Sequence, residues 1–242
     1  MEPAEYALMD EAEGAMWWYR ALHARLSDRL ARIDGPILDA GCGTGGLLAR
    51  LGAQSGARLG AADLYGVEFD QDAAARAAGK SSARIARGTV NALPFADARF
   101  AAVVSADVLC HAAVAPDTAL AEFHRVLRPG GMLLLNLPAY QWLASAHDRR
   151  VHNARRYAAG GVRRALTTAG FSNVRVRYWN FLLLPLMILQ RKLLASADDA
   201  ASDVAAFPPW LDAMLFGVTE LERAVPLPWP AGGSILATAD RA

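Results

Sequence analysis

The stretch Ile37-Leu38-Asp39-Ala40-Gly41-Cys42-Gly43-Thr44-Gly45-Gly46-Leu47-Leu48 decides the fold of this chain. An apolar run leads to an acidic residue. Four of the six positions 41–46 are glycine, and a second apolar run with helical spacing follows. This order predicts a buried strand, a tight turn and the start of a helix. Glycine suits the turn because it adopts positive φ and lets a ligand approach the backbone. Exposed N–H groups at the helix start favour a polar ligand, so we expect a nucleotide-like cofactor here.

The glycine motif is compatible with two cofactors. Gly41, Gly43 and Gly46 match the dinucleotide-binding pattern G-x-G-x-x-G. Asp39, Gly41, Gly43 and Gly45 match a second pattern, D-x-G-x-G-x-G. A turn that needs glycine only for packing is a third interpretation. The segments that follow the turn must therefore decide.

Four later segments distinguish between these interpretations of the glycine motif, at residues 64–70, 88–95, 100–111 and 124–137. The first reads as a strand that ends in a carboxylate, and the third as another strand. The second is similar to a G-D-x-x-x-L-P-F loop, and the fourth contains Arg128-Pro129-Gly130-Gly131 between a predicted helix and a predicted strand. In this order and spacing, residues 37–137 resemble the class I S-adenosylmethionine-dependent methyltransferases. Nicotinamide-dependent enzymes do not share the fourth segment.

The resemblance implies a fold, a cofactor and a set of binding residues. The fold is α/β, a Rossmann-like doubly wound sheet of seven strands, mostly parallel, with the last strand antiparallel. The cofactor is S-adenosyl-L-methionine, and an acid at the position of Glu68 accepts hydrogen bonds from the ribose hydroxyls. The loop acid of the family is Thr89 here, so adenine recognition rests on Thr89, on the backbone near Val90 or on the Asn91 side chain. The expected cofactor-binding residues of the core are Asp39, Gly41, Cys42, Gly43, Gly45, Glu68, Phe69, Thr89, Val90, Asn91, Ser105 and Asp107.

Composition favours one methyltransferase domain over residues 1–242. The chain is long enough for a large core, and its 54% of hydrophobic residues can cover a parallel sheet on both faces. A net charge of +1 gives no argument for nucleic-acid binding. Cys42 and Cys110 lack metal-site spacing, so neither a metal site nor a disulfide framework is expected. The N-terminus is acidic and has no apolar signal region, which predicts a cytoplasmic protein. We expect a monomer or a homodimer.

Residues 1–36 form a predicted helical lead-in that carries the aromatic cluster Trp17-Trp18-Tyr19-Arg20. In one interpretation these rings fix the helix to the core. In the other they form a flap over the cofactor, where Tyr19 or Arg20 reaches its methionine carboxylate. An aromatic face beside a sulfonium is favourable because a cation is attracted to a π cloud.

Residues 138–180 follow the fifth strand and are expected on the substrate side, because ligands lie outside the carboxyl ends of parallel strands. From His147 to Arg177 there are eight arginines and one acid, which form either a solvated basic face or an anion-binding segment. A helix over 161–170 and a strand over 174–178 close this part of the chain. The candidate substrate-binding residues are Tyr140, Trp142, Asp148, Arg156 and Tyr157.

Residues 181–233 are a predicted helical insertion before the last strand, which begins at 234. The apolar run 181–189 is too short to span a bilayer. Four interpretations of the insertion are open. It packs on the core or forms a dimer face, or it lines an apolar acceptor pocket or contacts a membrane surface. Beside the basic segment, it favours an amphiphilic or anionic small-molecule acceptor.

The expected reaction is methyl transfer to a small molecule, with O-methylation of a natural-product, lipid-like or carrier-bound acceptor as the leading subtype. A hydroxyl acceptor benefits from a general base near neutral pKa, and the candidates are His111, His147 and His152, with Asp148 able to orient His147. N-methylation or C-methylation is the first alternative. A non-catalytic S-adenosylmethionine-binding protein is the second.

Overall fold

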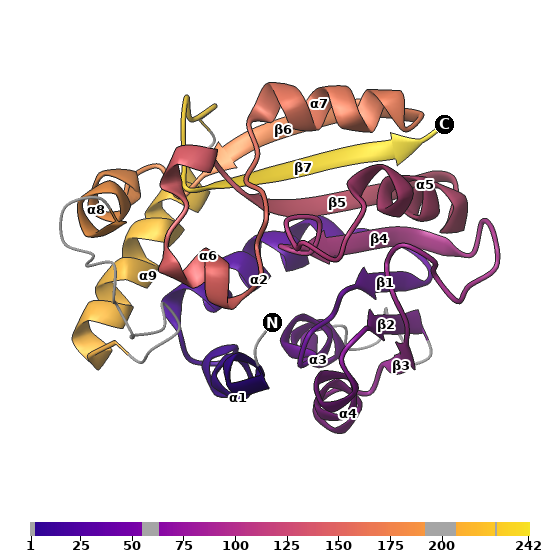
Figure 1. The fold of residues 1–242 in the computed structure, drawn as a ribbon, viewed down its shortest axis with the longest axis horizontal. Helices are drawn as coiled ribbons and strands as arrows, with labels where there is room; N and C mark the ends of the chain where they lie inside the picture. Colours follow the sequence, from indigo (N-terminus) through magenta and orange to yellow (C-terminus); the bar gives the residue numbers. More distant parts are fainter. Residues whose placement is uncertain (1–2, 55–62, 192–206, 226) are drawn as a thin grey trace.

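A computed structural model describes residues 3–54, 63–191, 207–225 and 227–242 of the chain. A central sheet is flanked by helices on both faces (Figure 1). The elements, in chain order, are α1 (Pro3–Ala12), α2 (Trp17–Leu30), β1 (Ile37–Ala40), α3 (Gly46–Gln54), β2 (Leu64–Glu68), α4 (Gln71–Lys80), β3 (Arg84–Arg87), β4 (Phe100–Ala106), α5 (Pro116–Val126), β5 (Leu127–Pro138), the 3-10 helix η2 (Gln141–Leu143), α6 (Ala146–Arg150), α7 (Ala159–Thr168), β6 (Phe171–Trp179), α8 (Leu184–Leu189), α9 (Pro209–Ala224) and β7 (Ser234–Arg241).

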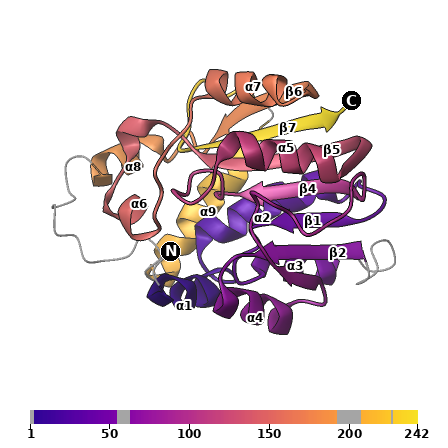
Figure 2. The ribbon, with the colours of Figure 1, turned by 45° about the vertical axis from the view of Figure 1, so that its right-hand side comes forward.

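The predicted seven-stranded sheet is confirmed, with strand order β3-β2-β1-β4-β5-β7-β6. Strands β1 to β5 run parallel to one another, and β7 lies between β5 and β6 and is antiparallel to both. The order reverses at β1 and β4, which is the switch point where α/β sheets bind ligands. Four helices (α1, α6, α8 and α9) gather at the end of the sheet where the parallel strands finish (Figures 1 and 2).

The core forms two apolar layers because successive side chains of a strand point to opposite faces. On β5, Leu133 and Leu135 pack with α5 and α7, whereas Leu134 packs with α2 and α3. Helical apolar stripes complete each layer, such as Leu22 and Leu26 of α2. The sheet is thus buried on both faces, as its continuous apolar strands require.

Glycine permits two close approaches around the turn between β1 and α3. Gly41 has φ +87°, and a Cβ there would lie 2.4 Å from a methyl carbon of Val108. Gly45 has φ +88°, and its Cβ would lie 2.8 Å from the Cα of Ala77 in α4. A side chain at either position would displace the loop after β4 or the helix α4. The glycines therefore serve packing as well as ligand access.

The insertion after β6 packs on the core through α9, as one interpretation of the sequence proposed. Glu222 of α9 is 3% exposed and accepts hydrogen bonds from the backbone N–H groups of Asn180, Phe181 and Leu182. Arg25 of α2 donates to the Thr219 carbonyl at 2.7 Å and lies 3.9 Å from Glu222. These contacts join α2, α9 and the end of β6. Residues 192–206 of the predicted insertion lie outside the described residues.

We predict that Glu222→Ala lowers the free energy of unfolding by about 3 kcal/mol, because it removes the negative charge beside the buried Arg25 and leaves three N–H groups without an acceptor. Glu220→Ala is the matched control on the same helix, since Glu220 pairs with Arg223 at the surface. Its loss should stay below about 1 kcal/mol. Urea unfolding of both variants measures the difference. Equal losses would contradict the anchoring role of Glu222.

Candidate functional site

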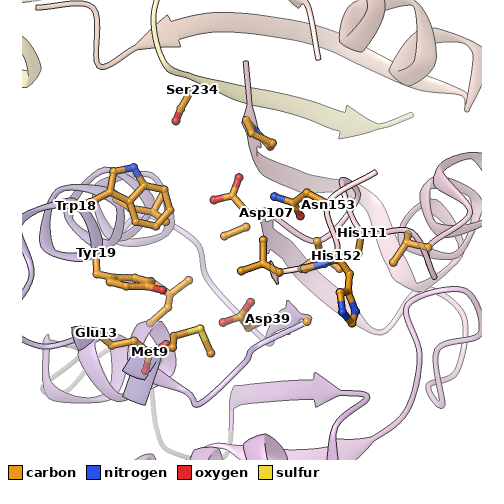
Figure 3. Close-up of a pocket in the computed structure, with 18 of the residues that line it drawn as sticks. Met9, Glu13, Trp18, Tyr19, Asp39, Asp107, His111, His152, Asn153 and Ser234 are labelled. Carbon is orange, nitrogen blue, oxygen red and sulfur yellow. The ribbon is translucent and has the colours of Figure 1, made fainter. Parts of the chain in front are cut away.

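A cavity of about 740 Å³ lies at the carboxyl ends of the parallel strands. Its walls come from both halves of the sheet, from α1 and α2, and from the segment that contains α8. Figure 3 shows Trp18 and Tyr19 on one side of it, and Asp107, Asn153 and the two histidines His111 and His152 on the other. Cavities of this size and position hold small ligands and cofactors.

Glu68 ends β2 and is fixed by the backbone around it. Its carboxylate accepts hydrogen bonds from the N–H groups of Gly43 at 3.0 Å, Phe69 at 2.9 Å and Asp70 at 3.0 Å. Burial raises the pKa of Glu68, while these three N–H groups oppose the rise. The side chain lines the cavity at 8% exposure. A carboxylate held this way presents its remaining acceptor positions to a ligand hydroxyl.

Asp39 at the end of β1 is 3% exposed and also lines the cavity. Burial raises its pKa to about 8, and the nearby carboxylates of Glu13 and Glu68 add to the rise. A cationic ligand would reverse this effect, because a nearby positive charge favours the ionised carboxylate. A positively charged ligand beside Asp39 would therefore stabilise its ionised form.

Helix α1 covers the glycine turn, a feature that the sequence analysis missed. Tyr6, Met9 and Glu13 line the cavity, and a Cβ on Gly43 would lie 2.7 Å from the terminal methyl of Met9. Glu13 accepts hydrogen bonds from Thr44 Oγ1 at 2.7 Å and from Lys80 Nζ at 2.9 Å. No local motif marks these residues. Only the fold brings α1 onto the turn, so the covering segment extends beyond the predicted aromatic flap.

The loop after β3 brings Thr89, Val90 and Asn91 to the cavity wall. The Asn91 amide already has two partners, since Nδ2 donates to the Ala113 carbonyl and Oδ1 accepts from the N–H of Ala115. Asn91 thereby ties this loop to the one after β4. The Thr89 hydroxyl accepts from the Asn91 N–H at 3.2 Å, but its own O–H group can still donate to a ligand, and this leaves Thr89 and the backbone near Val90 as the better candidates for adenine recognition.

The aromatic cluster of α2 contributes to the cavity wall and also fixes this helix to the core, while its contact with a cofactor stays a prediction. Trp17, Trp18 and Tyr19 line the cavity. Trp18 also stacks on Trp179 at 6.5 Å between ring centroids, which fixes α2 to β6. Arg20, predicted to reach the cofactor, is not among the residues that line the cavity. Its guanidinium pairs with Asp212 at 3.0 Å and lies 3.9 Å from the ring centre of Phe216.

Two of the three candidate bases, His111 and His152, line the cavity. Burial lowers the pKa of His111 below 6.5, so the imidazole is neutral at pH 7 and can accept a proton. His147 lies in α6, but its side chain is outside what the structure describes. Among the described side chains, Asp148 contacts Ser145, Asn153, Arg156 and Arg191, and its orienting role toward His147 stays a prediction.

Asp107 follows β4 with φ +54° and lines the cavity. Its Oδ2 accepts a hydrogen bond from Asn136 Nδ2 at 2.9 Å, and Asn136 Oδ1 accepts one from Trp179 Nε1 at 2.9 Å. Burial raises the pKa of Asp107 to about 7, although the bond from Asn136 opposes the rise. This network fixes the orientation of the carboxylate. Asn136 had no predicted role, because its contacts depend on three strands.

The predicted substrate-binding residues are mainly structural, which corrects the expectation for this segment. Arg156 lines the cavity, but it forms a two-bond ion pair with Asp148 and donates to the Ala139 carbonyl. Burial opposes ionisation of Asp148, yet Arg156 outweighs it and keeps the pKa of Asp148 low. Tyr157 donates to the Leu109 carbonyl at 2.7 Å. Tyr140 stacks between Trp142 and Tyr178, and neither Tyr140 nor Trp142 is among the cavity-lining residues.

Of the other residues predicted to bind the cofactor, some line the cavity and others lie outside its wall. Gly41 and Phe69 line the cavity. Ser105 is buried, and its hydroxyl donates to the Ala40 carbonyl at 2.7 Å, so it joins β4 to β1 rather than facing a ligand. The remaining three residues lie in the turn just behind the wall, with the Cys42 side chain in the apolar core: Cys42, Gly43 and Gly45.

The fold and this cavity define a protein that binds a nucleotide-like cofactor at an α/β switch point. A family model described as a methyltransferase domain matches residues 38–135. The chain is 36% identical over 145 residues to the ubiquinone/menaquinone biosynthesis C-methyltransferase of Paracoccus denitrificans, covering 56% of each protein. It is 32% identical over 158 residues to a protein of Encephalitozoon cuniculi provisionally assigned as a methyltransferase, covering 64% of this chain and 67% of the relative.

Among solved structures, a Thermotoga maritima S-adenosylmethionine-dependent methyltransferase, described as a possible histamine N-methyltransferase, shares the fold. Its TM-score is 0.63 at 17% identity, over 98% of this chain and 99% of that one. The chain belongs to the class I S-adenosylmethionine-dependent methyltransferases. The matches span between 34% and 67% of the length of the curated relatives.

The residues present fit S-adenosylmethionine, the cofactor of this family. The buried carboxylates Asp39 and Glu68 complement a cationic cofactor with ribose hydroxyls, and the turn at Gly41 leaves its backbone accessible. Trp18 and Tyr19 add aromatic surface, which suits a sulfonium. Asp39, Glu68 and the loop at Thr89 and Val90 would therefore hold the cofactor.

We predict that Asp39→Asn stabilises the ligand-free protein progressively as pH rises from 5 to 8. The folded-state pKa of Asp39 is about 8, well above the ordinary aspartate value of 3.8, so between these pH values the folded wild type binds a proton that the unfolded chain has lost. Wild-type stability then falls by at most about 1.4 kcal/mol per pH unit from this group, and the asparagine variant lacks that loss. Thermal unfolding at several pH values measures the difference. Asp34→Asn, at an exposed carboxyl, is the control, and a pH-independent Asp39 effect would contradict the assignment.

Proposed function

We propose that the chain transfers a methyl group from S-adenosylmethionine to a small molecule, with a hydroxyl of a natural-product, lipid-like or carrier-bound compound as the leading acceptor. One observation carries the proposal. The cavity of about 740 Å³ joins the glycine turn and Glu68 to a second region walled by α2 and by residues around α8. Cofactor and acceptor can therefore share one enclosure, which is the arrangement that direct transfer needs.

The bound cofactor supplies a methyl group that its sulfonium already activates. The protein holds the acceptor near that carbon, and α1 and Trp18 exclude water from the enclosure. The S–CH3 bond of the bound cofactor would break to leave S-adenosylhomocysteine, while an imidazole of the protein would take the hydroxyl proton of the acceptor. His111 or His152 accepts it, because both line the cavity. A correctly placed base accelerates such a step by about 10²–10⁴-fold.

C-methylation is the second candidate, and one relative favours it. The similar protein of Paracoccus denitrificans is named as a C-methyltransferase of quinone biosynthesis, and an apolar wall of Trp17, Met187 and Phe207 suits a related carbon acceptor. N-methylation needs no strong base. A non-catalytic cofactor-binding protein remains the alternative outside catalysis.

The surface near α8 supports peripheral membrane contact as a further part of the proposal. Leu186 and Leu189 of this helix are 46% and 41% exposed, close to the cavity residue Met187. Within the described parts of the chain, no helix has the length and apolar character needed to cross a bilayer.

We predict that the chain binds S-adenosylmethionine and S-adenosylhomocysteine but not NADH, and that Glu68→Ala weakens both interactions at least tenfold. Glu68 offers the carboxylate that the ribose hydroxyls need. Calorimetric titration of the three nucleotides measures the affinities, and Glu11→Ala, at an exposed acid of α1, is the control. Binding of NADH alone would refute the proposed function.

We predict that His111→Ala or His152→Ala slows O-methylation by about 10²–10⁴-fold, because each change removes a cavity-lining base. The wild-type rate should fall as pH drops below 6.5, where His111 becomes protonated. The readout is transfer of labelled methyl from S-adenosylmethionine into a small-molecule extract. S-adenosylhomocysteine affinity should be unchanged.

His124→Ala is the matched control, since this imidazole packs on Phe171 outside the cavity. Wild-type rates in both cavity variants would contradict a histidine base and favour N-methylation.

A further inference from the structure

The part of the cavity proposed to hold the acceptor, called here the acceptor half, lies where β4, β5 and β6 end and β7 begins. Ala106, the last residue of β4, pairs with Asn136 of β5. Ser234, the first residue of β7, pairs with Pro138 on one side and with Trp179 on the other. The residues that follow Ala106 and Trp179 are Asp107 and Asn180, and both line the cavity with Ser234. Figure 3 shows Asp107 and Ser234 facing the same space as Trp18.

Asn180 has a polar atom that the fold itself leaves unused. The residue is 1% exposed and lies in the left-handed region with φ +62°. Its N–H donates to Glu222 Oε1 at 2.6 Å, and its carbonyl accepts from the N–H of Gly233 at 3.3 Å. In the side chain, Nδ2 lies 3.5 Å from Met187 Sδ, while Oδ1 has no donor among the described residues. A buried acceptor left without a partner is costly, so this oxygen favours a ligand that donates.

Asp107 presents a second acceptor group to the same space. Asn136 occupies Oδ2, and Trp179 fixes the Asn136 amide so that its NH₂ group faces the carboxylate. No ion pair to Asp107 is present among the described residues. The nearest cationic side chain that acts on it is Arg156, which is committed to Asp148. A ligand in this half of the cavity therefore meets hydrogen-bond acceptors.

Apolar side chains form much of the remaining wall of this half. Trp18, Met187 and Phe207 line it, and the Trp18 ring is held by its stack on Trp179. Arg191 also lines the cavity, but it donates to the Leu143 carbonyl at 2.9 Å. Both cavity-lining guanidinium groups are engaged with the protein, Arg156 with Asp148 and Arg191 with the Leu143 carbonyl, so neither is directed at an anionic head group beside the Asp107 carboxylate.

We infer that the acceptor presents a hydrogen-bond donor, a hydroxyl or an amine, to Asp107 and Asn180, and an apolar body to Trp18, Met187 and Phe207. Carboxylate and phosphate acceptors are disfavoured, contrary to the anionic acceptor that the arginine-rich sequence suggested. The inference rests on the proposed function and specifies the acceptor of that same site.

The test uses three probes that share a phenyl ring on a four-carbon chain and differ in the group at its end: 4-phenylbutanol, 4-phenylbutylamine and 4-phenylbutyrate, whose fourth carbon is the carboxyl carbon. S-adenosylhomocysteine is titrated first, and each probe is then titrated into the saturated complex by calorimetry. The alcohol and the amine should bind at least tenfold more tightly than the carboxylate. Asn180→Gly keeps the left-handed backbone but removes the amide, and it should weaken the alcohol and the amine about tenfold.

Asn173→Gly is the matched control, since Asn173 is also left-handed with φ +49° but is exposed on β6. At pH 8, where Asp107 is mostly ionised, Asp107→Asn should improve binding of 4-phenylbutyrate about tenfold, because it removes the opposing charge. Equal or tighter binding of the carboxylate by the wild type would overturn the inference. So would an Asn180→Gly variant with wild-type affinities, or a saturated complex that binds none of the probes. Failure of S-adenosylhomocysteine itself to bind would overturn the proposed function, and this inference with it.

Discussion

The close packing around the turn after β1 is the constraint on which the rest of the structure depends. At Gly41 the loop after β4 approaches within a distance that excludes a Cβ, and at Gly45 helix α4 does the same. That packing brings the ends of β1, β2 and β4 together, so Asp39, Glu68 and Asp107 reach one cavity. A change of glycine here would alter the sheet and the site at once.

The cavity is built with unfavourable electrostatics that a ligand can relieve. Burial raises the pKa values of Asp39 and Asp107 to about 8 and about 7. Fixed polar groups hold the carboxylates in place: backbone N–H groups at Glu68, and the chain from Trp179 through Asn136 at Asp107. The protein gives up some stability to keep these charges enclosed and oriented, as functional sites commonly do.

The glycine turn and the apolar strands could be predicted from the sequence, because local backbone chemistry and alternation determine them. The roles of Glu68 and of the loop at Thr89 were expected from the resemblance to the methyltransferases, and both line the cavity. Contacts across the sheet left no local signal: the Arg156–Asp148 pair turned a predicted anion-binding arginine into a structural one, and α1 reached the turn only through tertiary packing. Asn180 was missed for the same reason, since its role depends on Glu222 and Met187.

The most direct test of the account is a crystal structure of the chain with S-adenosylhomocysteine. The account predicts the ribose within hydrogen-bond distance of Glu68, α1 in place over the glycine turn, and the sulfur directed toward the half of the cavity that contains Asp107 and Trp18. A nucleotide bound elsewhere, or one whose sulfur points away from that half, would contradict a single enclosure for cofactor and acceptor.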